Sequence, residues 1–173
     1  MRGWLGPIMA GLVVAALAYA LVIARTPKFL MGRAVERVAA AGGMNRFTHA
    51  PLATDRSRTI VRPSPDLAYS SCPFDVSAGP LLIEATPVAA PYWSLSVFDS
   101  DTTVAFVRND ASGARRRVKV AVLADGQQAP AGYEPVRLMG HRGIALIRIL
   151  VPDRQLFAQI DRERRQATCR VAG

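Results

Sequence analysis

The chain has 173 residues, a length that fits one globular domain plus an additional segment. Half of the residues are hydrophobic, and 22 Lys and Arg against 13 Asp and Glu give a formal net charge of +9. The basic residues fall in short clusters without interleaved aromatic side chains, which argues against a nucleic-acid-binding surface. A solvated surface, or contact with anionic lipid or polymer, accounts better for them.

The first segment, Trp4 to Ala24, has no charged residue in 21 positions. As a helix it would be about 31 Å long, which matches the hydrocarbon thickness of a bilayer. We therefore predict an uncleaved transmembrane anchor at residues 1–25, in contact with membrane lipid over residues 4–24. The alternative is a secretory signal cleaved after Ala20, but the apolar run continues beyond that site.

Two features bear on the orientation of this anchor. Four basic residues follow the apolar run and, by the positive-inside rule, favour a cytoplasmic C-terminal domain: Arg25, Lys28, Arg33 and Arg37. Long domains can translocate regardless of such charges. The only cysteines, Cys72 and Cys169, favour an oxidising compartment if they form a disulfide, whereas two buried unpaired thiols would be neutral on the question. We predict that the domain lies outside the cytoplasm.

Residues 26–58 are predicted to form a juxtamembrane helix and a linker. Thr26 and Pro27 are expected to end the anchor, and the spacing of apolar residues predicts a short amphipathic helix over Phe29 to Ala41, stopped by Gly42 and Gly43. This helix either lies along anionic headgroups or packs on the domain. The following residues, which include His49, lack periodicity and are expected to be irregular.

Residues 59–173 are predicted to form the domain, and its pattern is mainly β. In Trp93 to Phe98, for example, apolar residues alternate with serines, as in an antiparallel sheet with one polar face. The predicted strands are Thr59–Val61, Leu67–Phe74, Leu81–Thr86, Trp93–Phe98, Val104–Val107, Arg116–Leu123, Val136–Leu138 and Gly143–Leu150. Turn signals every ten to fifteen residues suit a sandwich or a barrel.

One helix is predicted near the C-terminus, over Pro152 to Gln166, where Leu156, Phe157 and Ile160 form an apolar stripe. Thr168 to Val171 is expected to add an edge strand, which would bring Cys169 back towards the body of the sheet. The expected fold is thus a mainly β, antiparallel sandwich with one C-terminal helix, preceded by the transmembrane helix and the short amphipathic helix.

Catalytic and metal motifs are scarce. The chain has two histidines, His49 and His141, and neither a GxSxG motif nor a Cys/His metal-ligand spacing nor a phosphate-binding glycine loop. We predict no metal, no cofactor and no catalytic residue, and a binding function rather than an enzymatic one.

The densest polar region runs from Arg62 to Asp75. Arg62, Asp66, Tyr69 and Arg148 could form either a buried hydrogen-bonded network or a small pocket for an anionic ligand, and the network is the favoured interpretation. Six residues make up the candidate ligand site: Arg62, Asp66, Tyr69, Ser70, Asp99 and Arg148.

Several motifs in this order resemble the domain of unknown function DUF1254. They are Arg62-Pro63-x-x-Asp66-x-x-Tyr69-Ser70, then Asp75-x-Ser77-x-Gly79-Pro80, then Tyr92-x-Ser94 with Asp99 and Thr102. The resemblance covers roughly Thr59 to Asp153 and implies a jelly-roll type of sandwich. It also implies that a separate protein carrying a DUF1214 domain, absent here, is a partner, and it favours a periplasmic domain with a disulfide. Ser64 and Leu67 replace the Asn and Thr of the family pattern, positions that would have offered ligand contacts.

The sequence therefore predicts a single-pass protein of the bacterial inner membrane whose β domain faces the periplasm. We expect a binding or assembly module of the cell envelope. The alternative is an enzyme or a small anionic-ligand binder that uses the polar cluster around Arg62, Asp66 and Tyr69.

Overall fold

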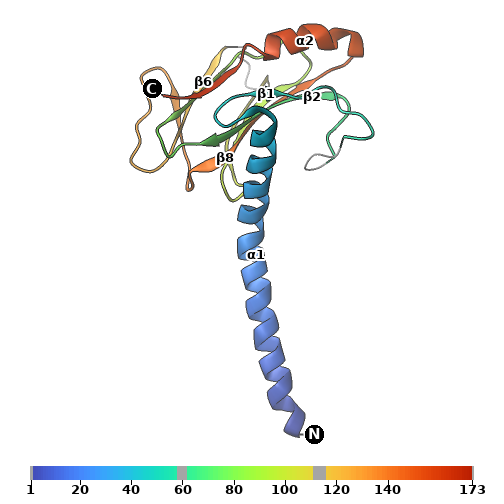
Figure 1. The fold of residues 1–173 in the computed structure, drawn as a ribbon, viewed down its shortest axis with the longest axis vertical. Coiled ribbons are helices and arrows are strands. Elements are labelled where there is room, and N and C mark those ends of the chain that lie inside the picture. The colour runs from blue at the N-terminus through green and yellow to red at the C-terminus, as the bar shows by residue number, and fades with distance from the viewer. Residues whose placement is uncertain (1, 58–61, 111–115, 173) are drawn as a thin grey trace.

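The computed structural model describes residues 2–57, 62–110 and 116–172. A long helix, α1, extends from a β-rich region, and the N-terminus lies at its far end (Figure 1). A short helix, α2, lies on the opposite side of the β region from the free end of α1 (Figure 1).

Helix α1 spans Leu5–Gly42, 38 residues, after a short 3-10 turn at Arg2–Trp4. The prediction of two separate helices is wrong, since the anchor segment and the amphipathic segment form one continuous helix with Pro27 inside it. Proline removes a single main-chain hydrogen bond, and the helical turns on both sides outweigh that loss here. The hydroxyl of Thr26 donates to the carbonyl of Val22 at 2.6 Å.

The C-terminal part of α1 packs on the β region. Met31 and Val35 are buried against Ile144, with Phe98 beside them. The interpretation of Phe29–Ala41 as a helix packed on the domain is therefore the correct one. The predicted stop is confirmed: α1 ends at Gly42, and Gly43 has a φ of +87°, a conformation that favours glycine.

The first sheet has five strands in the order β1-β2-β8-β4-β5, all antiparallel. They are β1 (Thr48–His49), β2 (Leu67–Asp75), β4 (Trp93–Phe98), β5 (Val104–Asn109) and β8 (Arg142–Leu150). Four of these strands were predicted, and β1 was not, because residues 44–58 were expected to be irregular. Predicted strand Thr59–Val61 lies outside the described residues.

The second sheet has four strands in the order β7-β6-β3-β9. They are β3 (Leu81–Ala85), β6 (Val118–Leu123), β7 (Glu134–Arg137) and β9 (Thr168–Val171), and β9 is the expected edge strand. The β6–β7 pair is parallel, so the antiparallel prediction is wrong there. Residues between the two strands return across the sheet, where Ala129 and Tyr133 pack on Leu82, Ala121 and Leu123.

Buried side chains from both sheets belong to one hydrophobic cluster. Trp93 and Phe74, which are 1% and 0% exposed, contribute to it from the first sheet, and Leu81 and Val120 from the second. In β4 the apolar residues of this cluster alternate with serines, as the period of two predicted.

The C-terminal helix region begins with a 3-10 turn, Arg154–Leu156, and continues as α2, Phe157–Arg164. The Asp153 carboxylate accepts a hydrogen bond from Gln155 N at 2.9 Å and so caps the start. Ile160 joins the shared hydrophobic cluster and Phe157 packs against it, whereas Leu156 is 45% exposed, so the predicted helix is confirmed and its apolar stripe is confirmed in part.

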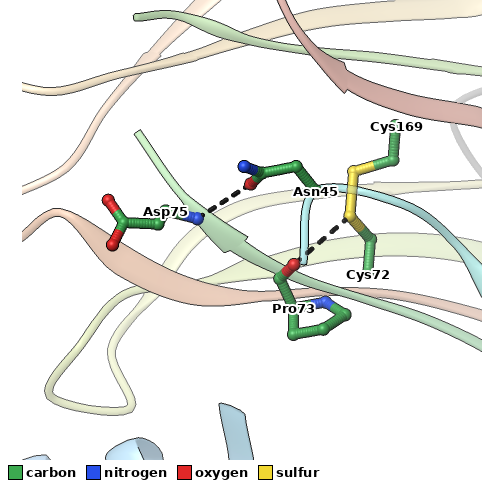
Figure 2. The surroundings of a disulfide bond; sticks show 5 residues. All are labelled: Asn45, Cys72, Pro73, Asp75 and Cys169. Carbon is green, nitrogen blue, oxygen red and sulfur yellow. Dashed lines mark hydrogen bonds between the residues drawn. A yellow bond between two sulfur atoms is a disulfide. The ribbon is translucent and has the colours of Figure 1, made fainter. Parts of the chain in front are cut away.

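A disulfide joins Cys72 of β2 to Cys169 of β9, and thereby links the two sheets across 97 residues of sequence. Both cysteines are buried, and because their sulfur atoms are bonded to each other, the alternative of unpaired thiols does not hold. Beside the disulfide, Asn45 Oδ1 accepts a hydrogen bond from Asp75 N at 2.9 Å, which fastens the segment after α1 to β2 (Figure 2).

Candidate functional site

The predicted site residues divide between the two faces of the five-stranded sheet. On β2, Ala68 and Cys72 belong to the shared core, so Ser70 lies on the core side and Tyr69 on the outer side. Arg148 is the direct partner of Tyr69 across β2 and β8, and of Ser94 across β8 and β4. Tyr69 and Arg148 are therefore brought together, and Ser70 is directed away from them.

The outer face carries a small polar cluster around Arg148. Arg148 Nη2 donates to Ser96 Oγ at 3.4 Å, and Tyr92 bonds Ser94 through their hydroxyl groups at 2.9 Å. The Tyr69 hydroxyl accepts a hydrogen bond from Ser64 N at 3.0 Å. Among the described residues, Arg148 Nε is buried without a hydrogen-bond partner. The cluster matches the predicted network in part, with one donor left over.

Arg62 and Asp66 do not join this cluster. Both are exposed, and within the described part of the chain no hydrogen bond or ion pair connects either side chain to Tyr69 or Arg148. Asp66 contributes through its main chain, because its carbonyl accepts a hydrogen bond from Val151 N at 2.8 Å. The Arg62–Asp66 segment thus shapes the entry into β2.

Asp99 lies elsewhere, in the loop after β4. It follows Ser94, the partner of Arg148, by five residues, which is about 16 Å along an extended strand. Its carboxylate is 4% exposed and accepts hydrogen bonds from three main-chain N–H groups, those of Ser100, Met139 and Gly140, at 2.5, 2.6 and 3.2 Å. These contacts join the β4–β5 loop to the segment before β8.

A second polar cluster, which sequence reasoning missed, lies between β1, β2 and α2. His49 Nδ1 is 2.8 Å from Ser70 Oγ. Arg164, 2% exposed, donates to the carbonyls of Tyr69 and Ala50 at 2.6 Å each, and its Nε donates to Asp161 Oδ1 at 2.8 Å. The available signal was the position of Arg164, one helical turn after Ile160 on the apolar stripe of α2.

The charges of this cluster set its protonation states. Burial lowers the pKa of His49, the Arg164 and Arg165 cations lower it further, and Asp161 raises it in part. Burial alone would raise the pKa of Asp161, but hydrogen bonds from Arg165 and Arg164 outweigh that effect and lower it. At neutral pH His49 is therefore uncharged beside an Arg164–Asp161 ion pair.

The Ser70–His49 pair combines a hydroxyl with a potential base, as in nucleophilic catalysis. Ser70, however, is 0% exposed on the core side of β2, next to its partner His49 of β1, so a substrate cannot approach its hydroxyl. Asp161 bonds the two arginines, and none of its hydrogen bonds goes to His49. The arrangement stabilises the contact between α2 and the first sheet.

A groove of about 340 Å³ lies between β5, β6 and β7, away from both clusters. Four of its lining residues are cationic and one is acidic: Arg108, Arg116, Arg117, Lys119 and Glu134. Arg108 pairs with Glu134 at 2.6 Å, and Arg117 pairs with Glu84 at 2.8 Å. Within the described residues, no three His, Cys, Asp or Glu side chains are grouped closely enough to hold a metal ion.

Comparison with known protein families gives a longer match than the resemblance over Thr59 to Asp153. A family model described as "Protein of unknown function (DUF1254)" matches residues 44–171, so the match includes β1 as well as the strands after it. No curated protein matches the chain.

Two solved structures resemble the chain. The VPA0106 protein from Vibrio parahaemolyticus has a TM-score of 0.61 at 15% identity, over 84% of this chain and 37% of its own. A putative uncharacterized protein from Burkholderia cenocepacia has a TM-score of 0.48 at 17% identity, over 75% of this chain and 34% of its own. The first likeness shows a shared fold, and the chain spans little more than a third of either structure.

Proposed function

Because the chain belongs to the DUF1254 family, whose description assigns no activity, we propose a function from its architecture: a single-pass anchor of the bacterial inner membrane that carries a periplasmic β domain, which acts as a binding or assembly module of the cell envelope. The two sheets would stack as a sandwich of the jelly-roll type, for which the shared hydrophobic cluster and the disulfide between the sheets are the support.

The observation that carries the proposal is the exposure of the first part of α1. Its large hydrophobic side chains between Trp4 and Ile23 are 53–75% exposed, and the helix is long and apolar enough to cross a membrane. A core helix of a soluble protein would bury such residues, whereas this part of α1 extends away from the β region (Figure 1). Lipid is the environment that would cover this surface without another protein.

The proposed compartment rests on the disulfide. Cys72 and Cys169 are paired and buried between strands of different sheets. Structural disulfides persist in oxidising compartments such as the periplasm and are rare in the cytosol. The four cationic residues after the apolar run do not oppose this orientation strongly, because a domain of this size can translocate regardless of flanking charge.

A partner is part of the proposal. The chain covers only 37% and 34% of the two solved structures that it resembles. A separate protein with a DUF1214-type domain would supply a second domain to pack beside this one. Its docking would make the anchored β domain an assembly subunit.

The experiment is to trap thiols in growing cells with a membrane-permeant alkylating reagent and then fractionate the cells. The full-length chain should appear in the membrane fraction, with Cys72 and Cys169 unmodified until a reductant is added. Alkylation of both cysteines in untreated cells would contradict a periplasmic domain. A chain shortened by about twenty residues and released from the membrane would contradict the anchor.

A second candidate function is binding of a small anionic ligand. The basic groove is a better site for such a ligand than the predicted cluster around Arg62, Asp66 and Tyr69. Four cationic residues and one carboxylate line the groove, which leaves an excess of three positive charges. Glu84, which is not one of the lining residues, forms an ion pair with Arg117. A concave site with this charge suits a ligand with two or more negative charges.

This candidate can be tested with inorganic pyrophosphate and the full-length protein in detergent micelles. Saturable binding should weaken about tenfold in Arg116→Gln and should fall as salt is raised. Arg162→Gln on α2, which removes an equal charge from an exposed position, is the matched control. Equal losses in both variants would exclude a site in the groove.

A further inference from the structure

The segment between β7 and β8 carries the most exposed large hydrophobic side chain described in the β region. Met139 is 95% exposed, compared with 52% for Val107, 49% for Val104 and 45% for Leu156. Single exposed apolar side chains are common on protein surfaces. The importance of Met139 therefore depends on how it is held and on what lies beside it.

Met139 is held by a buried carboxylate. Asp99, 4% exposed, accepts hydrogen bonds from Met139 N at 2.6 Å and Gly140 N at 3.2 Å. Gly140 fits tightly, because a Cβ atom there would overlap the Ser100 hydroxyl. Two loops are thus fastened to each other, and the methionine side chain is presented to the surroundings by a fixed main chain.

These loops lie beside α1. Phe98, which directly precedes Asp99, packs with Met31 and Val35 of the helix. The packing of Phe98 on Met31 and Val35 brings the β4–β5 loop to this part of the helix. In agreement with this, hydrogen bonds from Thr103 lower the pKa of Asp101, and the Lys28 cation, one turn before Met31, lowers it further. In Figure 1 the yellow-green β4–β5 loop lies alongside α1, on the side of the β region that faces the N-terminal end of the helix.

The position of Lys28 along the helix indicates how far these loops lie from the hydrocarbon core of the bilayer. It follows Ala24, the end of the uncharged run, by four residues, which is about 6 Å along a helix. The headgroup layer on each side of the hydrocarbon core is about 5–8 Å thick. Loops at the level of Lys28 are therefore at the height of the lipid headgroups if α1 crosses the bilayer.

We propose that Met139 inserts into the headgroup layer of the bilayer crossed by α1, so that the domain contacts the membrane through the loop held by Asp99. The occupant of this surface is lipid, because the surface is continuous with the membrane-spanning helix. A flexible, unbranched apolar side chain suits an irregular lipid interface. This inference rests on the membrane anchor of the proposed function.

The test uses the full-length protein in lipid nanodiscs, with a nitroxide label at one introduced cysteine at a time: Leu12→Cys, Met139→Cys and Leu156→Cys. Leu12 lies within the apolar run, and Leu156 precedes α2 on the opposite side of the β region (Figure 1). Oxygen, which concentrates in lipid, and a water-soluble nickel chelate measure the depth of each label. We expect position 12 in the hydrocarbon, position 139 at headgroup depth and position 156 in water.

The outcomes separate the two proposals. If position 12 is in lipid and position 139 is as accessible to the nickel chelate as position 156, the inference about Met139 fails and the anchor stands. If position 12 is itself in water, the proposed anchor fails. Shielding of position 139 from both reagents would indicate a protein partner or a second copy of the chain, and would also overturn lipid contact.

Discussion

At Arg164, a single side chain that is 2% exposed connects three parts of the fold. Its guanidinium bonds Asp161 within α2, the Tyr69 carbonyl in β2 and the Ala50 carbonyl just after β1. Removal of this cation would take at least one donor from each partner, while the Tyr69 carbonyl keeps the hydrogen bond from Ala50 N and Asp161 keeps its ion pair with Arg165.

Arg164→Met keeps much of the side-chain volume and removes the charge. We expect it to lower the free energy of unfolding by about 2 kcal/mol, the size typical of losing charge-assisted hydrogen bonds from a buried side chain. Denaturant unfolding followed by the fluorescence of Trp93, which is 1% exposed, measures the change. Arg162→Met, at an exposed position of the same helix, should change it by less than about 0.5 kcal/mol. Equal effects would contradict the role assigned to Arg164.

The lowered pKa of Asp75 predicts that the free energy of unfolding decreases at acid pH. Burial alone would raise its pKa, but hydrogen bonds from Ser77 and Arg142 lower the pKa from 3.8 to about 2. A lowered pKa contributes stability that is complete above the unfolded value and is lost as the pH falls towards 2. Because Arg142 is exposed, solvent screening limits the contribution to about 1 kcal/mol.

The variant Asp75→Asn should therefore be less stable than the native chain by about 1 kcal/mol above pH 4, and the difference should vanish as the pH approaches about 2. Urea midpoints measured across this range give the result. A difference that is independent of pH would show that Asp75 acts through packing rather than through its charge.

At this scale the sequence grouped some polar residues that the structure brings together and missed others for a physical reason. Tyr69 and Arg148 were grouped correctly, although the sequence did not show that the strand register pairs them. His49 and Arg164 were missed because their contact depends on a two-residue strand and on a helix packing over it, and neither leaves a periodic pattern.

The docking of α1 depends at its C-terminal end on a glycine without a side chain. A Cβ atom at Gly42 would overlap Thr48 Oγ1, whereas at Gly32, on the same helix, no atom lies within 4 Å. Gly42→Ala should lower the free energy of unfolding by about 1–2 kcal/mol. Gly32→Ala should raise it by up to about 1 kcal/mol, because alanine is the better helix former. Thermal unfolding of both variants checks the opposite signs, and the same sign for both would contradict the contact.

The disulfide is the covalent link between the two sheets. Removing it with Cys72→Ala and Cys169→Ala together should lower the free energy of unfolding by about 3 kcal/mol, since it closes a long loop of the unfolded chain. Denaturant unfolding of this variant should match that of the native chain treated with a reductant. If reductant left the free energy of unfolding of the native chain unchanged, the disulfide would make no contribution to stability.

Elements with strong periodicity were predictable. Strands β2, β3, β4, β5, β6 and β8 and the C-terminal helix follow from apolar alternation and turn residues. The errors lie where long-range contacts override local signals. Pro27 is accommodated in a continuous helix, and β7 pairs in parallel because the segment before it crosses the outer side of the second sheet.

At the scale of the whole molecule, α1 is the proposed membrane anchor and also packs on the β region. One continuous helix has an apolar part that extends away from the β region and a C-terminal part that packs against Ile144 and Phe98 (Figure 1). Because no break separates these parts, the domain is held at a fixed height on the helix. In the proposed orientation its loops at Asp99 and Met139 face the bilayer, and α2 and the basic groove remain available to a partner.

The most direct test of this account is labelling of an exposed position in the domain from outside the inner membrane. Gln128 is exposed in the loop after β6. In spheroplasts, a membrane-impermeant maleimide should label Gln128→Cys in the full-length, membrane-bound chain as completely before lysis as after it. Labelling that occurs only after lysis would place the domain in the cytoplasm and contradict the account.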